Sequence, residues 1–203
     1  MSALSRKTIA ERLADGSLVI SPILDSEQLG ESSIDLRMGT VVMLARAGAQ
    51  SHVEPAAYKE QDDHDSIRGK QQKHERFDIP FKRPFLLHPG TLALVPTMEW
   101  VKIPNNLQGI VTARSSWARE GLNIATATIV NPGYRGIITL ELANFGEIPI
   151  TLYPGLRLAQ IALYELTTPI EDDQKRSQFD MKFEPSAGNI AKDDYCFIPT
   201  IKA

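Results

Sequence analysis

Short apolar segments alternate with turn signals between residues 84 and 165. This spacing restricts the fold more than any other feature, because strands separated by turns about every 8 to 12 residues are typical of β-sandwiches and β-barrels. Proline and glycine mark the turns, for example in His88-Pro89-Gly90 and Tyr153-Pro154-Gly155. We predict a mainly β protein, for which jelly-roll topology is one solution, with strands at 84–87, 91–96, 98–103, 107–113, 124–130, 136–144, 148–153 and 156–165.

The N-terminal part starts with a helical pattern and then changes to strands. Ser5 is placed to cap a helix over residues 5–15, which has Ile9 and Leu13 on one face. Gly16 follows at the position where a left-handed residue commonly ends a helix. Beyond this glycine, turn residues separate short apolar runs, which predict further strands near 18–20, 34–37 and 41–44.

Two polar regions define the predicted domain organisation. The length of 203 residues fits one domain, which we place at 1–166. Within it, residues 46–77 lack apolar periodicity and are predicted to form a surface insertion. Residues 167–203 form a C-terminal tail that is polar at first, and such a tail is either unstructured or closes over a ligand.

Composition excludes several classes of protein. The formal charge of −3 gives no global attraction to nucleic-acid phosphates. Cys196 is the single cysteine, and the four histidines are scattered without the spacing of metal ligands. No apolar run approaches the roughly 18 residues of a membrane helix, and no signal-peptide core follows the N-terminal charges. We therefore expect a cytoplasmic protein that binds neither nucleic-acid polymers nor membranes.

The segment from Arg114 to Arg119 gathers groups that bind anions. Two guanidinium groups and the hydroxyls of Ser115 and Ser116 lie within six residues. If a strand turns into a helix or loop there, several donors point at one anion, as in phosphate sites. The alternative is that Ser115 or Ser116 caps a short helix on which Arg119 and Glu120 are solvated.

Glu141 lies in a strand pattern that places Ile138, Leu140 and Leu142 on the opposite face. It lies either at a solvated rim or in a pocket, where burial raises its pKa toward the range useful for proton transfer. Arg119 is the candidate for a basic partner in such a pocket.

Two further positions have structural and functional interpretations. The residues from Asn131 to Tyr134 form a Pro-Gly turn, which is first of all a chain reversal and alternatively a loop that contacts a ligand. Gln160 on the last strand is either an ordinary edge or interface residue or a ligand contact.

Taken in order, six motifs of the chain resemble the dCTP deaminase family of the trimeric dUTPase-like superfamily. The resemblance covers most of residues 4 to 165. The motifs are Ser33-Ile34-Asp35-Leu36-Arg37-Met38-Gly39, His88-Pro89-Gly90, Arg114-Ser115-Ser116-Trp117-Ala118-Arg119-Glu120-Gly121-Leu122, Thr126-Ala127, Asn131-Pro132-Gly133-Tyr134-Arg135-Gly136-Ile137-Ile138-Thr139-Leu140-Glu141 and Tyr153-Pro154-Gly155-Leu156-Arg157-Leu158-Ala159-Gln160.

The resemblance implies a distorted jelly-roll or β-barrel with few helices, and a homotrimer with active sites between subunits. It implies that dCTP and water give dUTP and ammonia without zinc, with Mg²⁺ bound through the nucleotide triphosphate. Glu141 would be the general base, and Arg119 would fix it and stabilise developing charge. Ser115 and the backbone carbonyl of Ala127 would position the water.

The resemblance also implies a set of nucleotide contacts, among them a lysine of the tail that reaches the phosphates. Around that lysine the chain departs from the family, with Phe183 and Ser186 in place of tyrosine and glutamine. The implied contacts are Arg114, Ser115, Ser116, Trp117, Ala118, Arg119, Asn131, Thr139, Leu140, Glu141, Gln160, Lys182 and Ser186.

A second departure concerns the product. Asn131 stands where the family has aspartate, and asparagine cannot accept a proton as a base. Ala118, where bifunctional relatives have glycine, points the same way. We therefore expect dUTP as the product. The alternatives are a bifunctional deaminase and diphosphatase that gives dUMP, an enzyme for a modified deoxycytidine nucleotide, and a non-catalytic nucleotide-binding protein.

Overall fold

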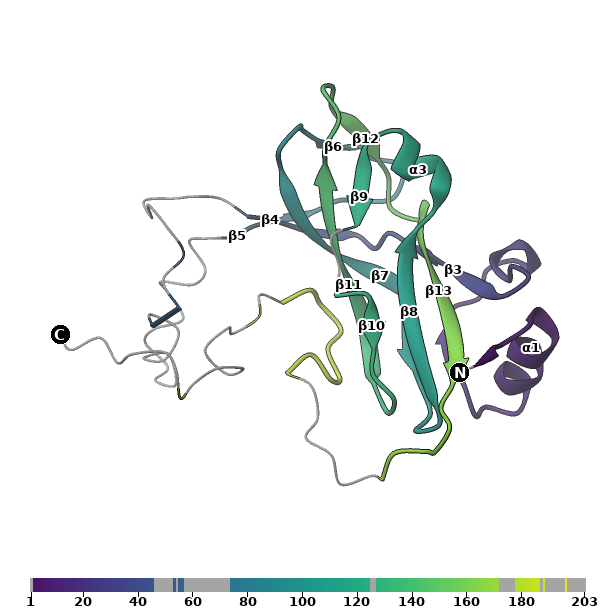
Figure 1. Cartoon of the computed structure of the whole chain (residues 1–203). Helices are drawn as coiled ribbons and strands as arrows, with labels where there is room; N and C mark the ends of the chain where they lie inside the picture. The colour runs from purple at the N-terminus through teal and green to yellow at the C-terminus, as the bar shows by residue number, and fades with distance from the viewer. Residues whose placement is uncertain are drawn as a thin grey trace.

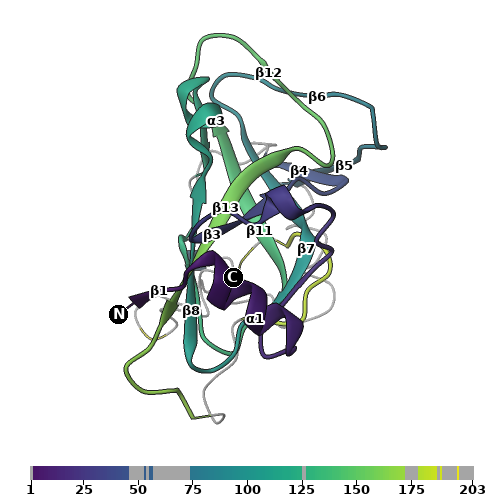
Figure 2. The same ribbon diagram turned by 90° about the vertical axis from the view of Figure 1, so that its right-hand side faces the viewer.

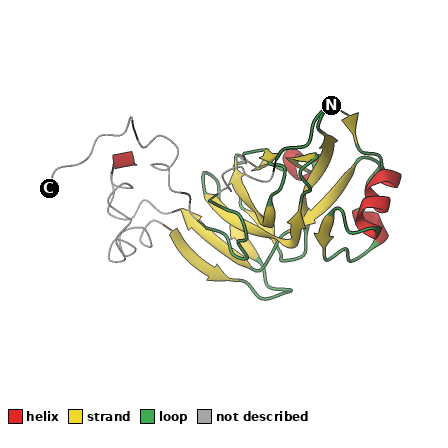
Figure 3. Cartoon of the chain, turned by 90° about the horizontal axis from the view of Figure 1, so that it is seen from below, coloured by secondary structure: helices red, strands yellow, loops and turns green. Residues whose placement is uncertain are grey.

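The protein is described here from a computed structural model, which covers residues 2–45, 53, 55–56, 74–124, 127–171, 178–186, 188 and 196. Strands make up most of its regular structure, and the named helices of this part are short (Figures 1 and 3). They are α1 (Arg6–Ala14), the 3-10 turn η1 (Ser26–Gln28) and α3 (Ser115–Arg119). The prediction of a mainly β protein is therefore confirmed.

The N-terminal helix forms as its capping residues predict. The Ser5 hydroxyl accepts a hydrogen bond from the backbone N–H of Thr8 at 3.4 Å, and Gly16 has a φ of +75° just beyond the helix. Ile9 of α1 is fully buried. An ion pair of 2.7 Å between Arg12 and Glu165 ties the helix to strand β13, beside which it lies (Figure 2).

Two large antiparallel sheets and a two-stranded ribbon make up the β structure. The first sheet has the order β1 (Ser2–Ala3), β13 (Arg157–Glu165), β8 (Leu107–Ala113), β10 (Ile129–Val130), and β3 (Ser33–Arg37) also pairs with β13. The second has the order β5 (His74–Asp78), β4 (Val41–Ala45), β7 (Leu92–Lys102), β11 (Arg135–Asn144), β9 (Leu122–Ile124), and β2 (Val19–Ser21) also pairs with β7. The ribbon joins β12 (Ile150–Leu152) to β6 (Phe85–Leu87).

One hydrophobic core joins the two large sheets. Leu140 and Leu142 from β11 and Ile161 and Leu163 from β13 are fully buried in it. The predicted face of Ile138, Leu140 and Leu142 is therefore confirmed as a core face. Helix α3 lies at the same end of the molecule as β6 and β12 (Figures 1 and 2).

Strand boundaries differ from prediction around Pro96. The segments 91–96 and 98–103 form the single strand β7, because a bulge accommodates the proline instead of a break. The Thr97 hydroxyl accepts the backbone N–H of Ile138 at 3.0 Å and donates to the Glu99 carbonyl at 2.8 Å. The Thr97 side chain thus supplies hydrogen bonds in place of backbone hydrogen bonds that the irregular strand pairing does not form.

Two other segments also differ. The predicted strand 124–130 is divided between β9 and β10, which belong to different sheets, so the chain crosses from one sheet to the other there. Residues 74–77 of the predicted insertion belong to β5, which pairs with β4. The rest of 46–77, apart from residues 53, 55 and 56, lies outside the described residues, as do large parts of the predicted tail.

None of the helices in the described ranges has the length and apolar character that a membrane crossing requires.

Candidate functional site

The predicted anion-binding segment is a short helix at the end of strand β8. Its first helical residue is Ser115, and Arg114 holds the cap position without a side-chain cap hydrogen bond. The prediction of a helix is right, whereas the interpretation in which a serine caps it is wrong, because both serines lie inside the first turn. Ser115, Ser116, Ala118 and Arg119 are exposed. Their hydroxyl and guanidinium groups are thus accessible to a ligand.

Trp117 and a glycine hold this helix in place. The indole Nε1 of Trp117 donates to the backbone carbonyl of Arg157 at 2.9 Å, while its half-buried ring packs on the core. Gly121 ends the helix with a φ of +87°, and a Cβ there would lie 2.8 Å from the backbone nitrogen of Gly146. Only glycine fits this turn, which leads straight into β9. The tryptophan therefore positions the helix from its buried side.

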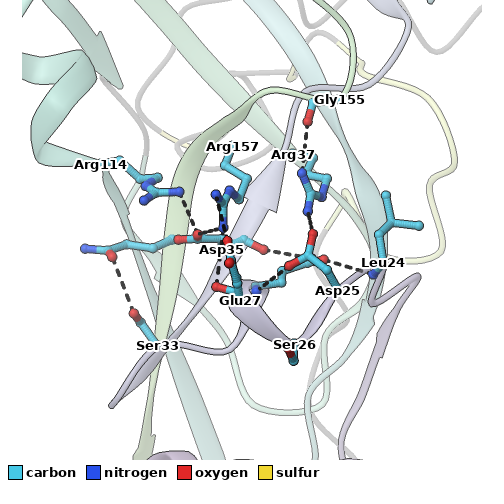
Figure 4. Close-up of polar contacts among 12 residues, drawn as sticks. Leu24, Asp25, Ser26, Glu27, Ser33, Asp35, Arg37, Arg114, Gly155 and Arg157 are labelled. Carbon is cyan, nitrogen blue, oxygen red and sulfur yellow. Dashed lines mark hydrogen bonds and ion pairs between the residues drawn. The ribbon is translucent and has the colours of Figure 1, made fainter.

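Arg114 belongs to a cluster of three arginines and three carboxylates (Figure 4). Its Nη1 lies 2.7 Å from Oδ2 of Asp35, and Nη1 of Arg157 lies 3.4 Å from the same oxygen. The remaining ion pairs are Arg37 with Asp25 at 2.6 Å and Arg157 with Glu27 at 3.8 Å.

Asp35 is the most enclosed carboxylate of this cluster, with a side chain only 12% exposed. Burial raises the pKa of Asp35, and the positive charges of Arg114, Arg157 and Arg37 partly offset that effect. Sequence reasoning assigned Asp35 no role, although a signal was present. Polar residues at 33, 35 and 37 alternate with buried apolar residues at 34 and 36, which indicates a polar strand face.

Gln160 extends this polar face across the sheet. Strand pairing places it between Asp35 of β3 and Thr112 of β8. Its side chain lies 3.4 Å from the Ser33 hydroxyl and 3.3 Å from the Thr112 hydroxyl. The structure thus brings Gln160 and Arg114 to the same polar face.

Glu141 lies on the second sheet, on β11 and opposite Leu94 of β7. Its residue is half-buried, and burial raises the pKa of its carboxyl. The structure thus places Glu141 between the two alternatives drawn from sequence, because burial raises its pKa while the residue stays partly exposed. Strand β9, which follows α3 directly, pairs with β11 up to Leu142, the neighbour of Glu141.

The other predicted residues of this region are distributed along the chain. Ala127 is exposed between β9 and β10. Asn131 is exposed in the predicted turn, where its carbonyl accepts the N–H of Tyr134 at 3.2 Å, so the turn is confirmed. Thr139 is half-buried on β11, whereas the Leu140 side chain lies wholly in the core and leaves only its backbone for a ligand.

The described part of the tail packs along the start of β11. The Asp180 carboxylate accepts the backbone N–H of Arg135 at 2.9 Å, and the Lys182 carbonyl accepts that of Ile137 at 3.0 Å. Glu184 forms two hydrogen bonds with Arg76 of β5, at 2.6 and 3.2 Å. The backbone of this segment therefore docks on the second sheet of its own chain.

Lys182 lies near the start of β11, apart from Glu141 of the same chain. Lys182 is exposed, and its backbone forms a parallel β-bridge with Gly136. Gly136 lies five residues before Glu141 in the sequence. At about 3.3 Å per residue, that separation is roughly 16 Å along the strand. Ser186 is half-buried further along the tail. Their predicted contacts with a nucleotide stay predictions.

Within the ranges that the structure describes, no group of three or more His, Cys, Asp and Glu side chains is arranged to hold a metal ion.

Comparison with known proteins places the chain in a family. A sequence profile described as dCTP deaminase-like matches residues 3–166. A relative from Methanobrevibacter smithii, named dCTP deaminase, dUMP-forming, is 34% identical over 198 residues, covering 95% of this chain and 97% of the relative. A relative of the same name from Dictyoglomus thermophilum is 39% identical over 170 residues, covering 83% and 82%. One from Halorubrum lacusprofundi, named dCTP deaminase, is 35% identical over 195 residues, covering 94% and 92%.

A solved structure supports the fold. The crystal structure of 2'-deoxycytidine 5'-triphosphate deaminase from Agrobacterium tumefaciens matches with a TM-score of 0.59 and 24% identity. The match covers 79% of this chain and 47% of the other, so the present chain spans about half the length of that protein. At this identity the likeness concerns the fold. Since the family profile spans most of the sequence and relatives above 30% identity cover nearly all of it, the chain belongs to the dCTP deaminase-like family.

Proposed function

We propose that this chain catalyses the hydrolytic deamination of dCTP. The observation that carries the proposal is Glu141, a half-buried carboxylate with a raised pKa inside the segment that matches the family profile. Relatives that match nearly the whole chain bear the name of this activity, which supports the same assignment.

In the proposed reaction, Glu141 takes a proton from water as the water oxygen bonds to C4 of the cytosine ring. Glu141 passes this proton to N3 of the ring and then carries the proton of the new C4 hydroxyl to the amino group. The C4–N bond breaks, ammonia leaves, and the C4 carbonyl of uracil forms. Water is a poor nucleophile at neutral pH, so a positioned base is needed as attack occurs. Ser115 and the Ala127 carbonyl would hold the water, and Arg119 would fix the glutamate.

The phosphates would bind at α3. Arg114, Ser115 and Ser116 offer N–H and O–H donors, which fit phosphate oxygens. Mg²⁺ would be bound through the phosphates, neutralising part of their charge and needing no all-protein cage. Lys182 and Ser186 of the tail would complete the nucleotide contacts.

The proposed assembly is a homotrimer with active sites between subunits, in the cytoplasm. Arg119 is exposed on α3. Lys182 pairs with Gly136, which lies five residues before Glu141 on β11 of the same chain. Residues from different subunits would then be able to meet at one nucleotide.

Formation of dUMP is the second candidate, because the relatives from M. smithii and D. thermophilum are named dUMP-forming. These names favour the bifunctional alternative over dUTP as the end product. Asn131 opposes it, since an amide in that exposed turn cannot act as a base for phosphate hydrolysis.

Product analysis tests both candidates. We expect purified protein incubated with dCTP and Mg²⁺ to release one ammonia per dCTP consumed. If dUMP forms, pyrophosphate appears in equal amount. If dUTP accumulates, Asn131→Asp is expected to shift the product toward dUMP. Unchanged dCTP would contradict the proposal and favour a nucleotide-binding protein without chemistry.

The acid side of the pH profile offers a second test. Glu141 must be ionised to accept a proton, and its pKa is raised from 4.5 by burial. Protonation therefore occurs at a higher pH than for an ordinary glutamate, so kcat/KM is expected to fall on acidification while the pH is still above 4.5. Circular dichroism over the same range checks that the fold persists. An acid limb at or below the ordinary glutamate pKa would contradict the assignment.

A further inference from the structure

Arg114 forms a short ion pair within the protein and is also accessible to solvent. Its Nη1 lies 2.7 Å from the Asp35 carboxylate, yet its side chain is 33% exposed (Figure 4). We propose that Asp35 is a positioning residue, which holds the Arg114 guanidinium so that its remaining N–H groups face the phosphates of the nucleotide. The inference rests on the proposed function and deepens it, because it names how the phosphate subsite is built.

Asp35 is suited to hold another side chain because its own place is fixed. It lies inside β3, and its residue is 9% exposed. Its backbone carbonyl accepts Nε2 of Gln28 at 3.0 Å, and that amide also donates to Oε1 of the buried Glu99 at 2.8 Å. The carboxylate therefore points from a rigid strand, not from a loop.

The geometry leaves donors on Arg114 for a ligand. A guanidinium has five N–H groups in a planar fork, and the hydrogen bond to Asp35 uses the Nη1 end. The Arg114 backbone is also held, since its N–H donates to the Leu158 carbonyl at 3.0 Å. With both ends of the side chain fixed, less rotamer freedom is lost when an anion binds.

The arrangement of charges around Asp35 also leaves Arg114 accessible to an anion. Asp35 is shared by Arg114 and by Arg157, whose Nη1 lies 3.4 Å from the same oxygen. Two guanidinium groups thus face one buried carboxylate. Glu27, the other acidic neighbour of Arg157, is 3.8 Å away and 82% exposed, so water screens it. The cluster as a whole is neutral, but the Arg114 guanidinium, whose residue directly precedes the serines of α3, is 33% exposed and therefore available to an anion.

The experiment compares Asp35→Asn with Asp25→Asn. The first keeps the shape of the side chain and removes the charge that holds Arg114. The second is the matched control, because it breaks the Arg37 ion pair in the same cluster without touching Arg114. Inorganic tripolyphosphate binding is measured by calorimetry, and KM and kcat are measured with dCTP.

A hydrogen bond to a charged group is worth about 1.5–3 kcal/mol, which corresponds to roughly 10- to 150-fold in affinity. We expect Asp35→Asn to weaken tripolyphosphate binding and to raise KM by at least about tenfold, with kcat changed by less than about threefold. Asp25→Asn should leave all three values near those of the parent protein. Equal effects of the two variants, or unchanged tripolyphosphate binding in Asp35→Asn, would overturn the proposal.

A double variant separates positioning from general damage to the fold. In an Arg114→Ala background, Asp35→Asn should add almost nothing to KM, since the group that it orients is gone. Additive effects would mean that Asp35 acts only through stability. If Asp35→Asn does not fold, Arg114→Lys replaces it, because lysine keeps the charge but lacks the planar fork; KM should again rise about tenfold, and an unchanged KM would overturn the inference.

The outcome also separates this inference from the proposed function. Tripolyphosphate binding does not require deamination. A protein that binds tripolyphosphate in an Asp35-dependent way but leaves dCTP unchanged would refute the enzyme and keep the phosphate subsite.

Discussion

Replacing Glu141 with glutamine is expected to lower the rate of deamination by at least about 10²–10⁴-fold while dCTP still binds. The amide has nearly the shape of the carboxylate, so contacts with the ring are kept. It cannot accept the proton that water must lose during attack, and a general base contributes a factor of that size. The measurement is ammonia release at saturating dCTP, together with dCTP binding by calorimetry.

Glu147→Gln is the matched control for this experiment. It makes the same chemical change in an exposed turn after β11, outside the half-buried position of Glu141. We expect the control variant to turn over dCTP at the parent rate. Near-normal turnover in Glu141→Gln would remove the general-base assignment, and loss of dCTP binding would point to a structural role instead.

Replacing Glu99 with alanine is expected to lower the free energy of unfolding by about 3–5 kcal/mol. Glu99 is fully buried on β7. Its carboxylate accepts Nε2 of Gln28 at 2.8 Å and the backbone N–H of Arg37 at 2.8 Å. Alanine removes the acceptor of the Arg37 N–H and of one of the two N–H groups of Gln28 Nε2, and it adds a cavity. Urea unfolding followed by circular dichroism measures the loss.

Two further variants show which property of Glu99 matters. Glu99→Gln keeps the volume and one carbonyl acceptor, so its loss should be clearly smaller than that of alanine. Glu31→Ala, at a side chain that is 94% exposed, should change stability by less than about 0.5 kcal/mol. A loss below about 1 kcal/mol in Glu99→Ala would mean that water or repacking satisfies the two donors.

The pKa of Glu99 adds a pH dependence to this comparison. Burial raises its pKa from 4.5, so in the unfolded chain the group releases its proton at a lower pH than in the folded chain. Its contribution to stability is therefore greatest below 4.5 and is lost as the pH rises through the raised value. Glu99→Gln should remove this part of the pH dependence.

Secondary structure could be predicted from the sequence where it is determined by residues that are close together in the chain. Ser5 and Gly16 define the ends of α1 through hydrogen bonding and backbone conformation within a few residues. The helix at α3 was predicted as one of two alternatives, and its cap was wrong. Around Pro96 the prediction failed, because Thr97 supplies from its side chain the bond that keeps β7 continuous.

The candidate site likewise has a part that could be predicted from the sequence and a part that could not. Arg114, Ser115 and Arg119 are neighbours in sequence, so their grouping as donors was available from the chain alone. The desolvation of Glu141 was left open, because alternation gives the face of a strand but not what covers it. Only the packed sheets show that this position is half-buried and that its pKa is raised.

By itself, the sequence determined a mainly β protein with an N-terminal helix, and it carried the motifs of the family. The tertiary structure decided which distant groups meet. Asp35 and Arg114 are 79 residues apart, and they pair because β3, β13 and β8 align Asp35, Gln160 and Thr112 in one row. That alignment depends on strand register, which is set by burial of a whole face and cannot be read from any single segment.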